Sequence, residues 1–365
     1  MYKKFILPII DTLDAETEHL VIRELLHFLE LSPNCKELIE QLTYKKKRFT
    51  DPRLNVTIGG IKLDNPLIVG AGWDKESRAV KALYQLGFSA IEVGTILTNP
   101  QEGNPKPRHF MLAAGVPLNR YGFNTIGMDD FAKNVETYRE MNIPMGINVS
   151  KNKDIEQIDA PYAFSDVVKK FYHDGDYFVI NVSSPNTPGL RQLQDKEPLT
   201  KIVQAVNETM DEKTGRKPVF VKIAPDITYE AVNDVIEVVM HNQLTGIIAT
   251  NTTLNADIKE TYGEQWRNEM GGVSGDDEDF RKMSTNIVKH IYKEAGNKIT
   301  IIGVGGIKDS KTALEKIKAG ATALQIVSAL DEEGPHLPGI INRGIVDYMD
   351  KEGVKHISEL VGVTA

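Results

Sequence analysis

The feature that most constrains the fold is a regular alternation of short apolar runs with amphipathic segments. Most of the runs are nearly continuous apolar stretches, which is typical of parallel strands covered by helices. In an intervening segment, Val232, Val235 and Val239 have the i, i+3, i+7 spacing of a helix that buries one face. We expect eight strands, at residues 66–72, 90–95, 145–150, 177–184, 219–224, 246–251, 300–306 and 323–328.

Eight β-then-α units predict an α/β fold, and specifically a closed (β/α)8 TIM barrel. An open doubly wound sheet is the alternative. The 365 residues are enough for such a barrel and a small appendage. We therefore divide the chain into an N-terminal helical extension at 1–50 and a barrel at 51–365.

The extension carries an apolar stripe on a predicted helix, followed by the basic run KKKR at 45–48. One interpretation is a helical cap packed on the barrel with a solvated linker. The other is a helix that lies on a membrane surface, with the basic run against anionic lipid. The residues of the stripe are Leu20, Val21, Leu25, Phe28 and Leu29.

Charge and composition exclude several classes of protein. The formal net charge of −8 argues against a nucleic-acid partner, which needs a basic face. The single cysteine, Cys35, excludes an internal disulfide and a thiolate metal site, and we expect no metal. The sequence contains no run of about 18 apolar residues, so we expect no membrane-spanning helix. The apolar residues at 5–10 stop at Asp11 without the cleavage site of a signal peptide.

Polar or glycine-rich residues follow every predicted strand. The active site of a TIM barrel lies where its strands end, so these residues are expected to converge at one mouth. Lysines and asparagines are costly to bury together unless a polar ligand binds them. The glycines at 303–306 offer backbone N–H groups to a phosphate, although a plain tight turn is the alternative. We therefore predict a ligand site at the mouth of the barrel.

Several long motifs make the chain resemble a known family. Between about residues 55 and 330, in order and spacing, it resembles dihydroorotate dehydrogenases of the quinone-linked, membrane-associated class. The resemblance implies FMN-dependent oxidation of (S)-dihydroorotate to orotate, with quinone as electron acceptor, in de novo pyrimidine (UMP) biosynthesis. The motifs are AGWDK (71–75), EVGT (92–95), NRYGFN (119–124), GINVSKNKD (146–154), NVSSPNTPGLR (181–191), VKIAPD (221–226), IATNTT (248–253), GGVSG (271–275) and IIGVGGI (301–307), with LDAETEH (13–19) before them.

The resemblance also implies roles for individual residues. Ser184 becomes the catalytic base with Thr187 as its relay, Lys75 binds and acts on the substrate, and His19 contacts the quinone. FMN is expected to be held by Ala71, Gly72, Thr95, Asn148, Asn181, Lys222, Thr250, Gly275, Gly306, Val327 and Ser328. Dihydroorotate is expected to be held by Lys75, Asn119, Arg120, Tyr121, Gly122, Phe123, Asn181, Asn186, Asn251 and Thr252.

Elementary chemistry is consistent with these roles. Asparagine side chains offer both donors and acceptors to a ring rich in N–H and C=O groups. A lysine answers the substrate carboxylate, and Lys222 would stabilise negative charge on the reduced flavin. Cytosolic relatives use a cysteine base in the loop that here contains Ser184, and the only cysteine, Cys35, lies far outside it. A cysteine base is thereby excluded.

The sequence departs from the quinone-linked class at the acceptor side. Met111 stands where an arginine usually lies, and Val327 stands where a tyrosine is usual. A different acceptor, such as fumarate or a soluble carrier, is therefore the alternative to quinone. A third alternative is a barrel that binds a flavin or a pyrimidine without catalysing a reaction. The presence of Ser184 and Lys75 argues against it. The expected location is peripheral, at the cytoplasmic face of a membrane, with the N-terminal helices in contact with lipid.

Overall fold

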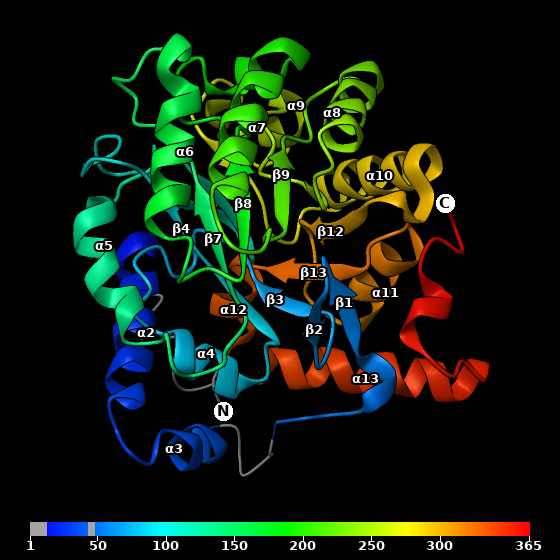
Figure 1. Cartoon of the computed structure of the whole chain (residues 1–365). Helices are drawn as coiled ribbons and strands as arrows, with labels where there is room; N and C mark the ends of the chain where they lie inside the picture. The colour runs from blue at the N-terminus through cyan, green and yellow to red at the C-terminus, as the bar shows by residue number, and fades with distance from the viewer. Residues whose placement is uncertain (1–12, 43–47) are drawn as a thin grey trace.

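The computed structural model describes residues 13–42 and 48–365. The apolar opening segment at 5–10 and residues 45–47 of the basic run lie outside the described residues. All eight predicted apolar runs contain a strand of a single closed parallel barrel, which confirms the TIM barrel and excludes the open sheet (Figure 1).

Around the ring the strands follow the order β10-β12-β13-β3-β4-β7-β8-β9. Their side chains are almost entirely buried, which is why the runs are apolar from end to end. The strands are β3 (Leu67–Val69), β4 (Ala90–Ile96), β7 (Met145–Val149), β8 (Tyr177–Asn181), β9 (Val219–Ile223), β10 (Gly246–Ala249), β12 (Thr300–Val304) and β13 (Ala323–Ile326).

Amphipathic helices cover the outside of the ring (Figure 1). Local capping fixes where several of them begin: Thr228 accepts from Ala231 N at the start of α8, and Asp277 accepts from Phe280 N at the start of α10. The helices are α4 (Val80–Leu86), α5 (Gly127–Glu136), α6 (Ala160–Lys170), α7 (Lys196–Asp211), α8 (Tyr229–His241), α10 (Glu278–Ala295), α11 (Ser310–Lys318) and α13 (Leu337–Glu352), with the shorter α9 (Ala256–Glu260) and α12 (Ser328–Glu333) inserted after β10 and β13.

Two small sheets lie at opposite ends of the barrel. The hairpin of β1 (Val56–Ile58) and β2 (Ile61–Leu63) lies where the strands begin, because its turn residue Gly59 packs on Pro218, directly before β9. At the other end, β5 (His109–Ala113), β6 (Val116–Asn119) and β11 (Gly272–Val273) form a three-stranded antiparallel sheet. The loops after β4 and β10 supply these three strands, so the sheet lies over the mouth where the strands end.

The N-terminal helices α2 (Ala15–Glu30) and α3 (Cys35–Leu42) lie outside the ring, beside α4 (Figure 1). Helix α2 buries Glu16, Arg23, Leu26 and Glu30, whereas much of the apolar stripe points away from the barrel. Val21, Leu25 and Phe28 are 45%, 50% and 72% exposed. Most of the stripe therefore does not dock on the barrel, although Leu29 packs against the core.

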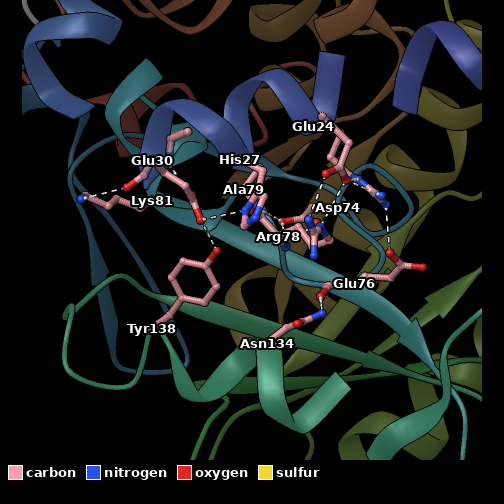
Figure 2. Close-up of polar contacts among 12 residues, drawn as sticks. Glu24, His27, Glu30, Asp74, Glu76, Arg78, Ala79, Lys81, Asn134 and Tyr138 are labelled. Carbon is pink, nitrogen blue, oxygen red and sulfur yellow. Dashed lines mark hydrogen bonds and ion pairs between the residues drawn. The ribbon is translucent and has the colours of Figure 1, made fainter. Parts of the chain in front are cut away.

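Besides the apolar contacts of Ile22, Leu26 and Leu29, α2 docks through polar side chains on residues 74–82, which comprise the link from β3 and the first residues of α4 (Figure 2). Glu24 accepts from the Arg78 guanidinium at 2.9 Å, and His27 Nδ1 donates to Arg78 O at 2.6 Å. Glu30 accepts from Ala82 N at 3.2 Å and from the Tyr138 hydroxyl, and burial raises the pKa of its carboxyl. Such contacts are hard to read from the sequence because they carry no apolar periodicity.

Candidate active site

A cavity of about 480 Å³ opens at the C-terminal ends of the barrel strands. We call the part at the strand tips, around Thr95, Asn181 and Lys222, the inner end. We call the part between α2 and the barrel, around His19 and Asp331, the outer end. One continuous cavity therefore joins the barrel mouth to the N-terminal helix.

Most of the site residues predicted from the sequence line this cavity. Asn148, Thr187 and Arg120 do not line it. Those that line it are His19, Ala71, Gly72, Lys75, Thr95, Asn119, Tyr121, Gly122, Phe123, Asn181, Ser184, Asn186, Lys222, Thr250, Asn251, Thr252, Gly275, Gly306, Val327 and Ser328.

A network of buried amides and hydroxyls forms the floor of the inner end. Asn148 Oδ1 accepts from Thr95 Oγ1 at 2.6 Å and from Asn181 Nδ2 at 2.9 Å. Asn148 thus lies behind the two residues that reach the cavity and fixes their orientation. Adjacent strands β4, β7 and β8 supply the three side chains, and Thr95 lies where the register of β4 and β7 shifts between Gly94 and Ile96.

Glu92 is a buried carboxyl in the barrel interior for which the sequence suggested no role. It accepts from Asn148 Nδ2 at 2.9 Å and from Gln325 Nε2 and the Tyr177 hydroxyl. Burial raises the pKa of Glu92, and the positive charge of Lys222 partly offsets this rise. Burial lowers the pKa of Lys222, and the negative charge of Glu92 partly offsets this fall. Glu92 thus gives the Lys222 ammonium an internal countercharge while Lys222 itself lines the cavity.

Lys75 lies on the loop after β3 and points into the cavity. Its Nζ is 3.0 Å from Asn124 Oδ1 and 3.4 Å from the centre of the Tyr121 ring. Burial lowers the pKa of Lys75 to about 7. An ammonium in such surroundings gains from an anionic partner, so this corner of the cavity suits a carboxylate.

Ser184 lies in the loop after β8 and is 5% exposed, so water is largely excluded from its hydroxyl. Its Oγ accepts from Asn186 N at 3.2 Å, and Asn186 Nδ2 donates to Asn119 O at 3.2 Å. The loop after β8 is thereby tied to the sheet over the mouth.

Two residues of the same loop were not singled out from the sequence. Ser183 Oγ donates to Asn181 Oδ1 at 2.8 Å and accepts from Asn251 Nδ2 at 2.9 Å, so it links two predicted ligand residues. Arg191 donates to Ser183 O at 3.1 Å and to Thr252 O at 3.0 Å. Arg191 therefore clamps the loops after β8 and β10 against each other.

Besides Asn148, two predicted residues, Arg120 and Thr187, do not line the cavity. Arg120 donates to Pro107 O at 2.9 Å and to the Glu269 carboxylate. Thr187 is buried, and its hydroxyl has no hydrogen-bond partner among the described residues, so it makes no direct contact with Ser184. The side chains of Thr187 and Ser184 therefore do not by themselves form the predicted proton relay.

At the outer end, His19 forms a compact group with Trp73 and Asp331. Its Nδ1 lies 3.0 Å from Asp331 Oδ2, its Nε2 lies 2.8 Å from Trp73 O, and Trp73 Nε1 donates to Asp331 Oδ1 at 2.9 Å. Because a carbonyl oxygen only accepts, Nε2 carries a hydrogen. Trp73 and Asp331 were not predicted, since only the folded chain brings α2, the loop after β3 and α12 together.

His109 also lies at the outer end, near His19 and Asp331, and the two residues that depart from the class pattern, Met111 and Val327, line the same cavity. Burial and the neighbouring His19 lower the pKa of His109 to about 4. The Tyr121 hydroxyl lies 2.9 Å from His109 Nδ1. Tyr121 thus contacts both a neutral His109 and Lys75, and so connects the outer and inner ends.

The loop after β12 offers unpaired donors to the cavity, and a glycine in the segment after β10 lines it too. No described residue accepts from the backbone N–H of Gly305 or Gly306, and both line the cavity. A Cβ on Gly275 would lie 2.0 Å from Gly115 O, so only glycine fits that position. The buried Oε1 of Gln325 also lacks a partner among the described residues. These groups fit a ligand that ends in a phosphate and presents a polar edge to the barrel axis.

Comparison with known proteins defines the class of this enzyme. The family model for dihydroorotate dehydrogenase matches residues 53–349. A Rhizobium etli protein, dihydroorotate dehydrogenase (quinone), is 42% identical over 316 residues, 85% of this chain and 85% of its own length. The protein of the same name from Allorhizobium ampelinum is 40% identical over 98% of this chain and 95% of its own length.

A solved structure agrees. The Eimeria tenella dihydroorotate dehydrogenase in complex with ferulenol has a TM-score of 0.81 and 32% identity, covering 91% of this chain and 95% of that chain. The family match thus indicates a barrel oxidoreductase with a flavin cofactor. The chain belongs to the dihydroorotate dehydrogenase family.

Proposed function

We propose that this protein oxidises (S)-dihydroorotate to orotate with FMN as cofactor and quinone as electron acceptor, in pyrimidine biosynthesis. The observation that carries the proposal is the convergence of Lys75, Ser184 and Lys222 on one cavity from three separate strand ends. One cation suits a substrate carboxylate, the hydroxyl suits a proton acceptor, and the second cation suits a reduced flavin ring.

FMN fits the residues that line the inner end. The unpaired N–H groups of Gly305 and Gly306 suit its phosphate, and Gln325 Oε1, Asn181 and Lys222 suit the polar edge of its ring. When bound, FMN supplies a ring that accepts a hydride and passes the two electrons to a second substrate. The protein's contribution is to orient that ring and to stabilise negative charge on it through Lys222.

For the substrate, Lys75 is placed to bind the carboxylate, and Asn119, Asn186 and Asn251 to hold the ring N–H and C=O groups. Ser184 Oγ takes the proton from C5 while the C6–H bond breaks with loss of hydride. A serine hydroxyl is a weak base at its ordinary pKa. The hydrogen bond from Asn186 N stabilises negative charge on Ser184 Oγ, and the exclusion of water favours proton transfer to it. The unpartnered Thr187 hydroxyl is the nearest candidate for the next step of the proton path.

Quinone is the acceptor that the outer end favours. Relatives of this chain are named dihydroorotate dehydrogenase (quinone), and His19 lies at this end of a cavity that the apolar side chains of Met111 and Val327 also line. Fumarate, a dianion, is disfavoured because Glu18, Asp331 and Glu332 line the same end.

A membrane surface is the proposed source of the quinone. The outward face of α2 presents Val21, Leu25 and Phe28, and Leu31 follows with 66% exposure. None of the helices that the structure describes has the length and apolar character needed to cross a bilayer. We therefore assign residues 1–50 to peripheral contact with lipid and quinone access, at the cytoplasmic face, and 51–365 to the FMN barrel.

Anaerobic addition of dihydroorotate to the purified protein tests the proposal. The yellow flavin absorbance should bleach, and a soluble quinone analogue should restore it faster than fumarate does. A protein that binds no flavin, or whose flavin band is unchanged by dihydroorotate, would contradict the proposed activity. Faster restoration by fumarate would contradict quinone as the acceptor.

A further inference from the structure

Lys316 is a buried cation that lies outside the cavity and has no role in the proposed reaction. It is on α11 and is 0% exposed. Its Nζ donates to Ser284 Oγ at 2.8 Å and lies 3.4 Å from Val304 O. Neither partner carries a charge, and no other hydrogen bond or ion pair of this ammonium with a described residue is formed.

A buried ammonium without a carboxylate partner is costly, because desolvation disfavours its charged form. Burial accordingly lowers the pKa of Lys316 to about 7. The charged groups that face it are Glu315 on α11 and Arg281 on α10, and these two pair with each other at 3.2 Å. Strand β12, against which it packs, carries no titratable side chain. A further anion close to Lys316 would therefore stabilise its charged form.

The lysine lies directly behind the loop that offers unpaired N–H groups to the cavity. A Cβ on Gly303 would lie 2.5 Å from Lys316 Cγ, so the stem packs on β12 itself. Ser284, which accepts from Lys316, donates to Val304 O, and its Oγ would lie 3.1 Å from a Cβ on Gly305. The ammonium is thus one hydroxyl away from the loop, on the side opposite to the cavity.

We propose that Lys316 is a phosphate-positioning residue: its buried ammonium is the countercharge, from behind the loop 304–306, of a phosphate dianion bound at Gly305 and Gly306. The inference rests on the proposed binding of FMN. It assigns the phosphate two kinds of support, direct N–H donors from the loop and a cation separated from it by one layer of backbone.

The proposal has a consequence for protons. Without the dianion, Lys316 is largely neutral above pH 7, since its pKa is about 7. The dianion raises that pKa, so FMN binding takes up a proton between pH 7 and 9. FMN affinity should then fall as the pH rises, by at most about tenfold per unit. Riboflavin, which has the same ring without the phosphate, should show no such component.

The experiment measures the dissociation constants of FMN and riboflavin, by quenching of flavin fluorescence, for the flavin-depleted full chain. Lys316→Met should weaken FMN binding by about tenfold or more, since a cation close to a dianion is lost, and leave riboflavin affinity unchanged. Lys259→Met is the matched control, because Lys259 is also buried and donates to a backbone carbonyl, Glu269 O at 2.7 Å. The control should bind both flavins as the wild type does.

Equal FMN affinity in Lys316→Met and wild type would overturn the proposal, as would an equal loss of affinity for both flavins. Should Lys316→Met not fold, the wild type still decides: its ratio of FMN to riboflavin affinity must fall between pH 7 and 9, and a flat ratio overturns the inference. A wild-type chain that binds neither flavin would overturn the proposed function as well, so the two failures are distinguishable.

Discussion

At its inner end the cavity is lined by residues from the tips of barrel strands, whereas its outer end is closed by α2 against the loops. Asn181 and Lys222 are paired by the register of β8 and β9, and Thr95 lies on β4 where its register with β7 shifts. His19 and Asp331 meet only because α2 docks on the barrel, although 312 residues separate them in sequence. The inner end is thus as rigid as the barrel, and the outer end depends on the docking of one helix.

The polar contacts of α2 extend this dependence toward the substrate. Glu16 pairs with Arg108 at 2.8 Å, and Arg108 lies 5.6 Å from the centre of the Tyr121 ring. Substitutions at the inner end should impair the oxidation of dihydroorotate, whereas substitutions on the exposed face of α2 or at Asp331, which leave the Glu16–Arg108 pair intact, should act on the acceptor side. The predictions that follow separate the two.

The largest effect is expected for Ser184→Ala. Loss of a general base typically costs on the order of 10²- to 10⁴-fold in rate, so the rate of flavin reduction at neutral pH should fall within that range while FMN stays bound. Stopped-flow absorbance measures the rate, and Ser165→Ala on α6 is the control. An unchanged rate of flavin reduction would remove Ser184 from the role of base.

The next effect concerns the outer face of α2. Replacing Val21, Leu25 and Phe28 together by serine removes exposed apolar surface worth about 1.5–3 kcal/mol per fully buried side chain. Because an interfacial helix buries its apolar face only partly, partition into vesicles of neutral and anionic lipid should fall on the order of 100-fold. Flavin reduction by dihydroorotate in solution should not change. Vesicle binding equal to that of the wild type would contradict a lipid-facing α2.

Lys75 should make the binding of orotate at the inner end depend on pH. A bound carboxylate favours the charged ammonium, so orotate affinity should be constant below the pKa of about 7 and decline above it. The decline should be about tenfold per pH unit until the pKa of the complex is reached. Titration of the flavin spectrum with orotate measures this affinity. In Lys75→Met the affinity should be lower and this decline absent; a decline as steep as in the wild type would assign it to another group.

The smallest effect is expected for Asp331→Asn. The amide keeps the shape but loses the charge that holds His19, so reoxidation of the reduced enzyme by a quinone should slow several-fold, on the order of one charged hydrogen bond. Flavin reduction should be unaffected. Double-mixing stopped-flow separates the two steps, and a variant slowed only in flavin reduction would place Asp331 with the inner end.

The same contrast between the two ends explains what could be predicted from the sequence. The eight strands and the polar residues at their tips were predicted because a buried parallel strand is an uninterrupted apolar run and its end is marked by Lys, Asn, Ser or Gly. Glu92 went unassigned because a single carboxylate in an apolar run does not reveal that it faces the barrel axis. The stripe on α2 was visible, but its direction depended on ion pairs such as Glu24–Arg78, which have no sequence period.

The central claim is that Lys75 and Ser184 act on one molecule at the inner end. The most direct measurement is a crystal structure of the FMN-loaded protein with orotate. The account predicts the orotate carboxylate within hydrogen-bond distance of Lys75 Nζ and its C5 edge toward Ser184 Oγ. Orotate bound away from Lys75, or with C5 turned from Ser184, would contradict it.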